Sequence, residues 1–523
     1  MRKLLFLFII GLAISITSCR KDFVFEPSTG GLEFSKDTVY LDTIFTNIGS
    51  STYRLKVYNN SDKDISIPKI QLRKGITSKY RITVDGLTGD IGATNKIFSN
   101  VELLAKDSLF IFIEVTADAA ITNPNDFLYT DNIDFYNISG TPQDVDLVTL
   151  IQDAIFIYPD KPLSTGIKET LTIEGLVGVE GHTLTLPNEL NWTSLKPYVI
   201  YGYAAVPNGS TLTINDGTSV YFHANSGLVI DNQAKLIIDG HLNDIDINGE
   251  ITAKHEVTFE GDRLESSFEN VPGQWGTVLI FSSLNNTINH LTLKNSAIGL
   301  YLQTNIVTGN PPKLEINESQ IYNSSNVGIL ARNSNINGRN LVINNAGQFC
   351  LSATYGGNYK FTHSTFINNW PSSKQLAVLL NDYLDIDATT FTSNPNPSNF
   401  EFINCIIYGS NNTEFFVNKK GTATFTYNLK NCLIKFNSSQ LNDTGLFEFN
   451  NITGPYSNSC FISKNNINYS PKFKNITKNQ LWPTVDLSLS PSLMPAFLSP
   501  VNVDILNKPR TPTITIGAYQ FIP

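Results

Sequence analysis

Residues 370–399 combine aromatic side chains with carboxylates in a way that suits the binding of sugars. The candidate ligand-binding residues of this stretch are Trp370, Asp382, Tyr383, Asp385 and Asp387. Aromatic rings stack on the apolar faces of sugars, and carboxylates accept hydrogen bonds from hydroxyl groups. Asp385 and Asp387 alternate along a strand-like run, so their side chains share a face. The stretch is predicted to be a projecting, ligand-binding loop, with a decorated surface loop as the alternative.

Catalysis at this loop would need groups that the sequence does not supply. Lysis of a sugar chain requires an ion that acidifies the α-proton of the sugar and a base that removes it. The loop holds acids without a convincing lysine or arginine partner, and a second acidic pair, Asp244 and Asp246, is interpreted as a solvated strand face. The 6 histidines have no metal-ligand spacing. No catalytic residue, metal site or cofactor is therefore predicted, and only calcium is left open.

An internal repeat indicates the scaffold that positions this loop. Cys432 follows Cys405 by 27 residues and Cys460 follows Cys432 by 28 residues, each within a similar strand-like run. Each repeat unit is predicted to be one coil of alternating apolar residues with a small inward side chain at the cysteine position. The three cysteines should therefore stack on consecutive coils, and a disulfide between two of them is left open. The same position holds Leu291, Ser319 and Ser364 in other units.

Asparagines near the end of each unit are expected at tight bends of the chain. An asparagine tolerates left-handed backbone geometry, hydrogen-bonds its own loop and can bond the asparagine of the next coil. Asn404 is expected at or beside such a bend, and His290 and His363 at equivalent, solvent-facing positions. The candidates for stacked asparagines are Asn295, Asn323, Asn344, Asn368 and Asn437.

The order of these features resembles the coils of right-handed parallel β-helix proteins, the pectate-lyase-like superfamily. The segments "VPNGSTLTINDGTSVYFHANSGLVI" (206–230) and "TIGAYQF" (515–521) are similar to segments of exported bacterial members. This resemblance implies the fold without a reaction, because the superfamily includes lyases, hydrolases, adhesins and proteins of no known activity.

The front of the chain has a different pattern. Strand-length runs such as "YRLKVYNN" and "SLFIFIEVTA" alternate with Asn, Ser, Asp and Gly turns, which predicts an antiparallel sandwich. Its sequence resembles the Ig-like modules of bacterial surface proteins. The predicted protein is therefore all-β, an N-terminal antiparallel β-sandwich followed by a right-handed parallel β-helix. The predicted segments are a signal peptide at 1–18, the sandwich at 19–158, a linker at 159–166 and the β-helix at 167–523.

The N-terminus indicates export. A basic head precedes an apolar run that is too short to span a bilayer, and the run ends in "ITSC". This ending resembles the bacterial lipobox, which implies that Cys19 is lipidated and anchors the mature protein to a membrane. The residues after it resemble lipoproteins of Bacteroidetes, so an outer-membrane lipoprotein on the cell surface or the periplasmic face is expected.

The composition excludes one class of partner and leaves three possible functions. The net charge of −9 provides no basic stripe, so nucleic acid is excluded as a partner. The favoured function is binding of polysaccharide, or of another envelope component, without turnover. The alternatives are a polysaccharide lyase or glycoside hydrolase, and a structural or adhesive surface protein.

Overall fold

The chain divides into two compact units, Met1–Asp153 and Ala154–Pro523. The first strand of the second unit, β11 (Ile155–Ile157), pairs in parallel with β14 (Tyr198–Ile200). The predicted domain boundary at 158 and the linker at 159–166 are therefore misplaced, because the second unit starts before them. The computed structural model describes residues 23–523 except 91, 93–94, 117–125, 174, 248–249, 305–308, 388, 439–444, 450–456, 459, 464–468, 486–500, 511–513 and 522–523. In the described part, no helix is long and apolar enough to cross a membrane.

The first unit is a sandwich of two sheets around one apolar core. Strand β8 shows why the sequence forms a half-buried strand: Leu109 and Ile111 are buried, whereas Phe110 and Phe112 are exposed. One sheet contains β1 (Glu26–Pro27), β5 (Ile65–Leu72), β7 (Ile97–Leu103), β9 (Asp126–Tyr136), β10 (Pro142–Gln152) and β3 (Thr38–Phe45). The other contains β2 (Glu33–Phe34), β4 (Tyr53–Tyr58), β8 (Ser108–Val115) and β6 (Tyr80–Val84).

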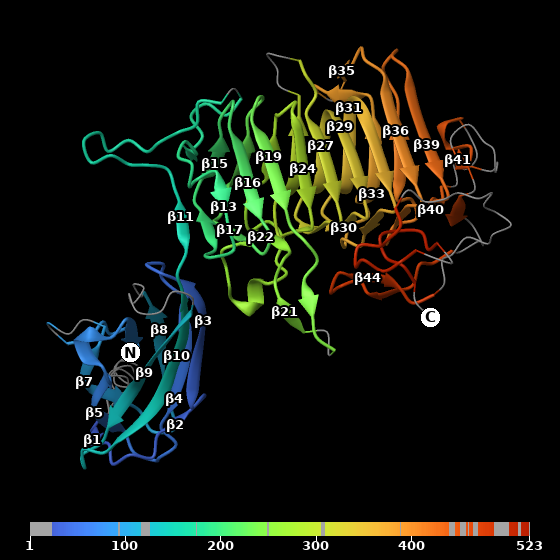
Figure 1. Ribbon diagram of the computed structural model, residues 1–523. Helices are drawn as coiled ribbons and strands as arrows, with labels where there is room; N and C mark the ends of the chain where they lie inside the picture. Colours follow the sequence, from blue (N-terminus) through green and yellow to red (C-terminus); the bar gives the residue numbers. More distant parts are fainter. Residues whose placement is uncertain are drawn as a thin grey trace, which may run out of the picture. The chain divides into compact units, whose positions relative to one another are not determined.

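The second unit is a parallel β-helix, which confirms the all-β fold class (Figure 1). Its coils form three parallel faces, here called face 1, face 2 and face 3. Face 1 consists of β11, β14, β17 (Ser219–Phe222), β22 (Val257–Gly261), β25 (Leu291–Lys294), β28 (Gln320–Ser324), β30 (Val342–Ala346), β32 (Thr365–Asn368), β37 (Ile406–Gly409), β40 (Leu433–Lys435) and β42 (Phe461–Ser463).

Faces 2 and 3 belong to one sheet that bends within its two longest strands, β29 (Val327–Arg339) and β31 (Phe349–Thr362). Face 2 holds β12 (Gly181–Thr183), β15 (Tyr203–Val206), β18 (Gly227–Ile230), β23 (Val278–Ile280), β26 (Ile298–Gln303), the first halves of β29 and β31, β33 (Leu376–Asn381) and β38 (Phe415–Asn418). Face 3 holds β13 (Asn191–Trp192), β16 (Thr211–Asn215), β19 (Lys235–Asp239), β24 (Asn285–Asn289), β27 (Lys313–Asn317), the second halves of β29 and β31, β36 (Ser398–Ile403), β39 (Phe425–Lys430) and β41 (Ser457–Asn458).

Short elements project from the coils. The hairpin β20–β21 (Asp244–Ile245, Ile251–Ala253) precedes face 1, and the hairpin β34–β35 (Tyr383–Asp385, Phe391–Ser393) lies between faces 2 and 3. A third hairpin, β43–β44 (Phe473–Asn475, Gln480–Pro483), lies near the C-terminus. The short 3-10 helices are η1 (Gly75–Thr77), η2 (Ser266–Phe268) and η3 (Gly445–Phe447).

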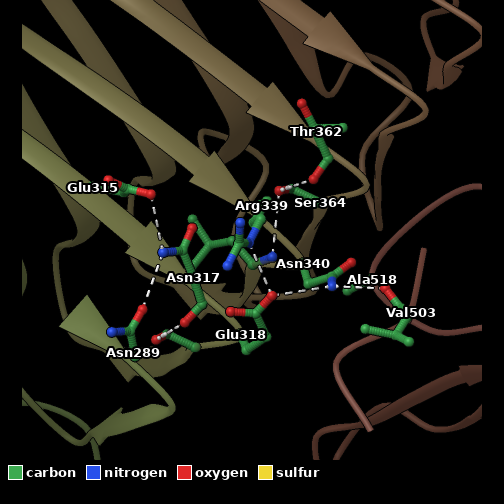
Figure 2. Close-up of polar contacts among 12 residues, drawn as sticks. Asn289, Glu315, Asn317, Glu318, Arg339, Asn340, Thr362, Ser364, Val503 and Ala518 are labelled. Atoms are coloured by element: carbon green, nitrogen blue, oxygen red, sulfur yellow. Dashed lines mark hydrogen bonds and ion pairs between the residues drawn. The ribbon is translucent and has the colours of Figure 1, made fainter. Parts of the chain in front are cut away.

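A tight left-handed bend joins face 3 to face 1 on successive coils. The bend residues have φ between 44° and 54°, a region that asparagine tolerates better than most residues. Figure 2 shows one part of this line, where Asn340 Nδ2 donates to Glu318 Oε1 at 3.4 Å and to the carbonyl of Val503 at 3.0 Å. The bend residues are His290, Glu318, Asn340, His363, Asn404 and Asn431.

The residue after each bend points inward, as predicted. The backbone N–H of Cys405 donates to Cys432 Sγ at 3.4 Å, and the N–H of Cys432 donates to Cys460 Sγ at 3.4 Å. Leu291 N–H donates in the same way to Ser319 Oγ at 3.1 Å. The inward line of cysteines is confirmed, and the cysteines are free thiols.

A second bend, between faces 1 and 2, carries the stacked asparagines. Asn323 Nδ2 donates to Asn295 Oδ1 at 3.4 Å, and Asn345 Nδ2 donates to Asn323 Oδ1 at 2.8 Å. The prediction was therefore wrong by one residue at Asn344, whose amide instead contacts Asn479. Asn368 is wrong as well, because its buried amide bonds the backbone at Ala346 and Leu376.

A C-terminal segment, described at residues 501–510 and 514–521, packs on the outer side of face 1. Face 1 presents apolar side chains there, including Val342, Ile367, Ile406 and Leu433, and the segment covers them with Ile505, Ile516, Ala518 and Tyr519. This cover explains one correction: His363 was expected to face solvent and is instead 0% exposed. Burial and the neighbouring Arg510 charge lower the pKa of His363 well below its usual value.

Candidate functional site

An open groove of about 910 Å³ runs across the outer side of face 3. Strand alternation divides the face into buried and outward positions, so residues in parallel register form continuous rows along the helix axis. One outward row consists of Asn285, Lys313, Asn335, Asn358, Asn399 and Thr426. The other consists of Glu315, Asn337, Lys360, Glu401 and Asn428.

Side-chain amides in the first row bond one another from coil to coil. Asn358 Nδ2 donates to Asn335 Oδ1 at 2.9 Å, and Asn399 Nδ2 donates to Asn358 Oδ1 at 2.8 Å. Thr426 Oγ1 continues the chain by donating to Asn399 Oδ1 at 2.5 Å. Each amide keeps a second N–H and a second oxygen lone pair for a ligand. This row, here called the amide ladder, therefore repeats donors and acceptors at the coil spacing of about 4.8 Å.

In the second row, the negative charge of Glu401 is balanced by neighbouring lysines. Glu401 lies between Lys360 at 3.2 Å and Lys430 at 3.1 Å. Partial burial alone would raise the pKa of Glu401, but the hydrogen bonds from both lysines hold it below its usual value. Glu401 therefore stays ionised, which makes it an acceptor of hydrogen bonds and a poor general acid.

The inner side of face 3 makes the groove rigid. The rings of Tyr359 and Phe400 stack at 5.1 Å with an interplanar angle of 3°. Tyr359 is 3% exposed, and its hydroxyl accepts from Ser334 N–H at 3.2 Å and donates to the Gly356 carbonyl at 3.0 Å. These rings lie under the amide ladder and fix the spacing of its members.

The structure separates the sequence-predicted site residues into two groups. Trp370 precedes β33, and Asp382 to Asp387 follow it. Six residues of β-strand span roughly 20 Å, so the aromatic ring and the carboxylates do not form one wall. The prediction of one projecting loop over 370–399 is corrected for this reason, because the intervening "LAVLLN" forms a strand of face 2.

The projecting hairpin β34–β35 holds the other predicted residues, and most of them position the hairpin itself. Asp382 is 1% exposed and accepts from the N–H groups of Lys420 at 2.9 Å and Gly421 at 3.0 Å. Tyr383 is buried under Lys420, whose ammonium lies 3.8 Å from the ring centroid. Asp385 pairs with Lys420 at 2.8 Å. Asp387 accepts from its own turn, and these hydrogen bonds lower its pKa.

A polar cluster on face 1 escaped the sequence interpretation. Glu256 accepts from Asn243 Nδ2 at 3.2 Å and from Thr292, while Lys294 pairs with Glu260 at 2.8 Å. Burial raises the pKa of Glu256. The alternation in "EVTFEG" (256–261), which places Glu256 and Glu260 on one strand face, was the available signal.

Asp244 belongs to the same region. Its carboxylate lies 3.5 Å from His255 Nε2, and Asp216 bonds the other ring nitrogen at 2.8 Å. The side chain of Asp244 is 71% exposed, in agreement with a solvated position. Among the described residues, no group of three or more His, Cys, Asp or Glu side chains is arranged to hold a metal ion.

Comparison with known proteins gives no family. No protein-family model matches the chain, and no curated protein matches it. Solved structures with local likeness include a family 123 glycoside hydrolase from Clostridium perfringens, with 8% identity, a TM-score of 0.17, and coverage of 25% of this chain and 31% of that one. A PapD-like domain of human CEP192 gives 10% identity and a TM-score of 0.15, covering 25% of this chain and 94% of that one. The E. coli chaperone DraB gives 12% identity and a TM-score of 0.15, covering 25% of this chain and 58% of that one. TM-scores this low carry no argument about fold or function.

Proposed function

We propose that this protein is an outer-membrane lipoprotein whose β-helix binds polysaccharide along the face 3 groove without turning it over. The amide ladder is the observation that carries the proposal. Polysaccharides present repeated hydroxyl groups, and a ladder of fixed amides offers repeated donors and acceptors along one line. An extended chain lying along the helix axis meets the same groups on each coil, so weak contacts add up over several sugars.

The proposal predicts that Asn358→Ala together with Asn399→Ala weakens glycan binding about thirtyfold. Each lost hydrogen bond is worth about 1 kcal/mol, and about 1.4 kcal/mol corresponds to a factor of ten in affinity. Isothermal titration against a panel of acidic and neutral polysaccharides, with and without calcium, measures the effect. Asn132→Ala in the first unit is the matched control and should bind as the wild type does.

Three other outcomes, two from this titration and one from an assay for new sugar ends, redirect the proposal. Trp370 lies before the start of β33 on face 2. Loss of binding in Trp370→Ala, with the amide ladder variants unaffected, would therefore place the ligand there and not in the face 3 groove. No binding to any glycan would favour a structural or adhesive role. New reducing or unsaturated sugar ends, abolished in Glu256→Gln, would favour a hydrolase or lyase. Glu256 and Glu260 support that second candidate, because two carboxylates in different environments can divide acid and base roles.

The membrane anchor is a separate part of the proposal. Cys19 lies outside the described residues, so its support is the lipobox-like sequence alone. Labelled palmitate is expected to enter the wild-type protein in its native host and to be absent from Cys19→Ala, because the thiol of Cys19 is the acceptor of the lipid. Equal labelling of both proteins would remove the anchor from the proposal. Protease shaving of intact cells then distinguishes the surface from the periplasmic face.

A further inference from the structure

A cavity of about 450 Å³ lies at the corner where face 2 turns into face 3. The strand β26 ends in Gln303, and Arg332 occupies the bend of β29, both on the cavity wall. The hairpin β34–β35 contributes Leu384 and Thr392 to the same wall. This corner pocket, as we call it, is therefore bounded by the hairpin that the sequence predicted as a projecting loop.

The guanidinium of Arg332 is held in place on one side only. Its Nη1 donates to the Tyr301 hydroxyl at 2.7 Å, and its central carbon lies 5.3 Å from the centroid of the Tyr301 ring. The Tyr301 hydroxyl in turn donates to Gln303. Arg332 Nε is buried and has no hydrogen-bond partner among the described residues. A buried N–H that lacks a partner costs about 1–3 kcal/mol, a cost that a small reorientation of the guanidinium toward an acceptor in the pocket would recover.

The charge of the corner pocket favours an anion. Arg332 is its one charged lining residue, and no carboxylate lines it within the described chain. The protein has a net charge of −9, and on face 3 the lysines Lys360 and Lys430 are both paired with Glu401. A guanidinium with a free edge binds planar or tetrahedral oxyanions through paired N–H donors.

The backbone of the corner pocket is held in an uncommon conformation. Asn333 has a φ of 47° and Tyr355 a φ of 59°, both in the left-handed region. Asn394 stabilises this arrangement, since its buried amide donates to the Tyr355 carbonyl at 2.8 Å. Such a conformation costs free energy, and it concentrates at sites where the chain must be held in one shape. Asn333 and Tyr355 lie just before the second halves of β29 and β31, which belong to face 3. The pocket therefore borders the strands that form the groove.

We propose that the corner pocket binds an oxyanion substituent, a carboxylate or a sulfate ester, on the glycan that occupies the face 3 groove. This inference rests on the proposed function and adds the chemical class of the ligand. Continuity supports it: Asn333 precedes Asn335 by two residues, and Asn335 is a member of the amide ladder. A sugar chain on the ladder can thus direct one charged substituent over the edge of face 3 toward Arg332.

The test compares polygalacturonate, dextran sulfate and neutral dextran at one fixed ionic strength by isothermal titration. Arg332→Gln is expected to weaken binding of a charged polymer by about tenfold to a hundredfold, because a hydrogen bond to a charged group is worth about 1.5–3 kcal/mol. Binding of neutral dextran should not change. The two charged polymers distinguish a carboxylate from a sulfate ligand. Arg54→Gln, which removes the same charge from the first unit, is the matched control.

Two further variants keep the test decisive. Arg332→Lys retains the charge and loses the paired donors, so its affinity should lie between those of the wild type and Arg332→Gln. Thr392→Trp leaves the guanidinium intact and fills the cavity from the exposed hairpin, and it should weaken charged polymers alone. An equal loss for charged and neutral polymers, or no loss in any of these variants, overturns the inference.

A small anion separates this inference from the groove proposal. Titration with sodium sulfate against sodium chloride should reveal weak sulfate binding that disappears in Arg332→Gln and persists in the double variant Asn358→Ala, Asn399→Ala. If sulfate binds and no polymer does, the groove proposal fails while the anion pocket stands. If polymers bind in the groove and neither sulfate nor charged polymers depend on Arg332, the corner pocket inference fails while the groove stands.

Discussion

Replacing Arg510 by Met is expected to lower the free energy of unfolding by about 4 kcal/mol and to release the C-terminal segment from face 1. Arg510 is 1% exposed and donates to the carbonyls of Val503, Thr515, Gly517 and Ala518. It also reaches back to the bend line, where Nη2 donates to Asn340 Oδ1 at 2.8 Å. Each acceptor that is left buried without a donor costs about 1–3 kcal/mol, and partial rearrangement offsets some of the sum.

Limited proteolysis combined with thermal unfolding measures this effect. Cleavage within residues 501–521 should become rapid in Arg510→Met, because the segment no longer remains on face 1. Arg263→Met is the matched control, since the Arg263 side chain is 45% exposed and pairs with Glu265 at 2.9 Å. Unfolding midpoints that match in both variants, with no new cleavage, would show that Arg510 does not hold the segment.

Raising the pH from 4 to 8 is expected to destabilise the protein by about 3 kcal/mol through Glu414 alone. Glu414 is 0% exposed, and burial raises its pKa to about 7 although it accepts from the N–H groups of Asn411 at 2.7 Å and Ala377 at 2.9 Å. The folded protein therefore binds this proton more tightly than the unfolded chain does. The stabilisation is fully present below the unfolded pKa of 4.5 and is lost as the pH rises through about 7, at about 1.4 kcal/mol per pKa unit.

The change in unfolding free energy with pH, taken as a difference between wild type and Glu414→Gln, isolates this group. The variant should lose the part of the pH dependence between 4.5 and 7 that Glu414 contributes, whatever its absolute stability. Glu401→Gln serves as the control because the pKa of Glu401 is lowered, so its titration lies below that window. Identical slopes for wild type and Glu414→Gln would contradict a raised pKa at this carboxyl.

The β-helix could be predicted from the sequence because its repeat is local. A small residue after a bend recurs at Ser319, Cys405 and Cys432, and each unit contains its own alternating strands, so the pattern needs no knowledge of distant contacts. The start of the helix was misplaced because β11 has three residues and pairs with β14, which lies some forty residues further along the chain. The segment after this short strand is rich in proline and glycine, so in the sequence it has the composition of a linker.

The groove could not be predicted because its rows depend on register between coils of unequal length. Asn358 lies 23 residues after Asn335, and Asn399 lies 41 residues after Asn358, since the hairpin β34–β35 lengthens that coil. The loop prediction also treated 370–399 as one unit, although β33 crosses face 2 within it. His363 was placed in solvent for a related reason, because its cover comes from residues 150 positions later in the chain.

The inward line of small residues has a consequence for how such a protein changes over generations. Because Cys405 and Cys432 make the same backbone contact and lie 27 residues apart, removing residues 405–431 would place Cys432 directly after Asn404 and keep its inward contact with Cys460. Gain or loss of a whole coil is thus a small structural event, whereas a one-residue deletion inside a strand would turn every following side chain of that strand inside out. Unequal recombination between similar coils can therefore lengthen or shorten the groove, and loss of this coil would also remove Ile406, one of the residues that the C-terminal segment covers.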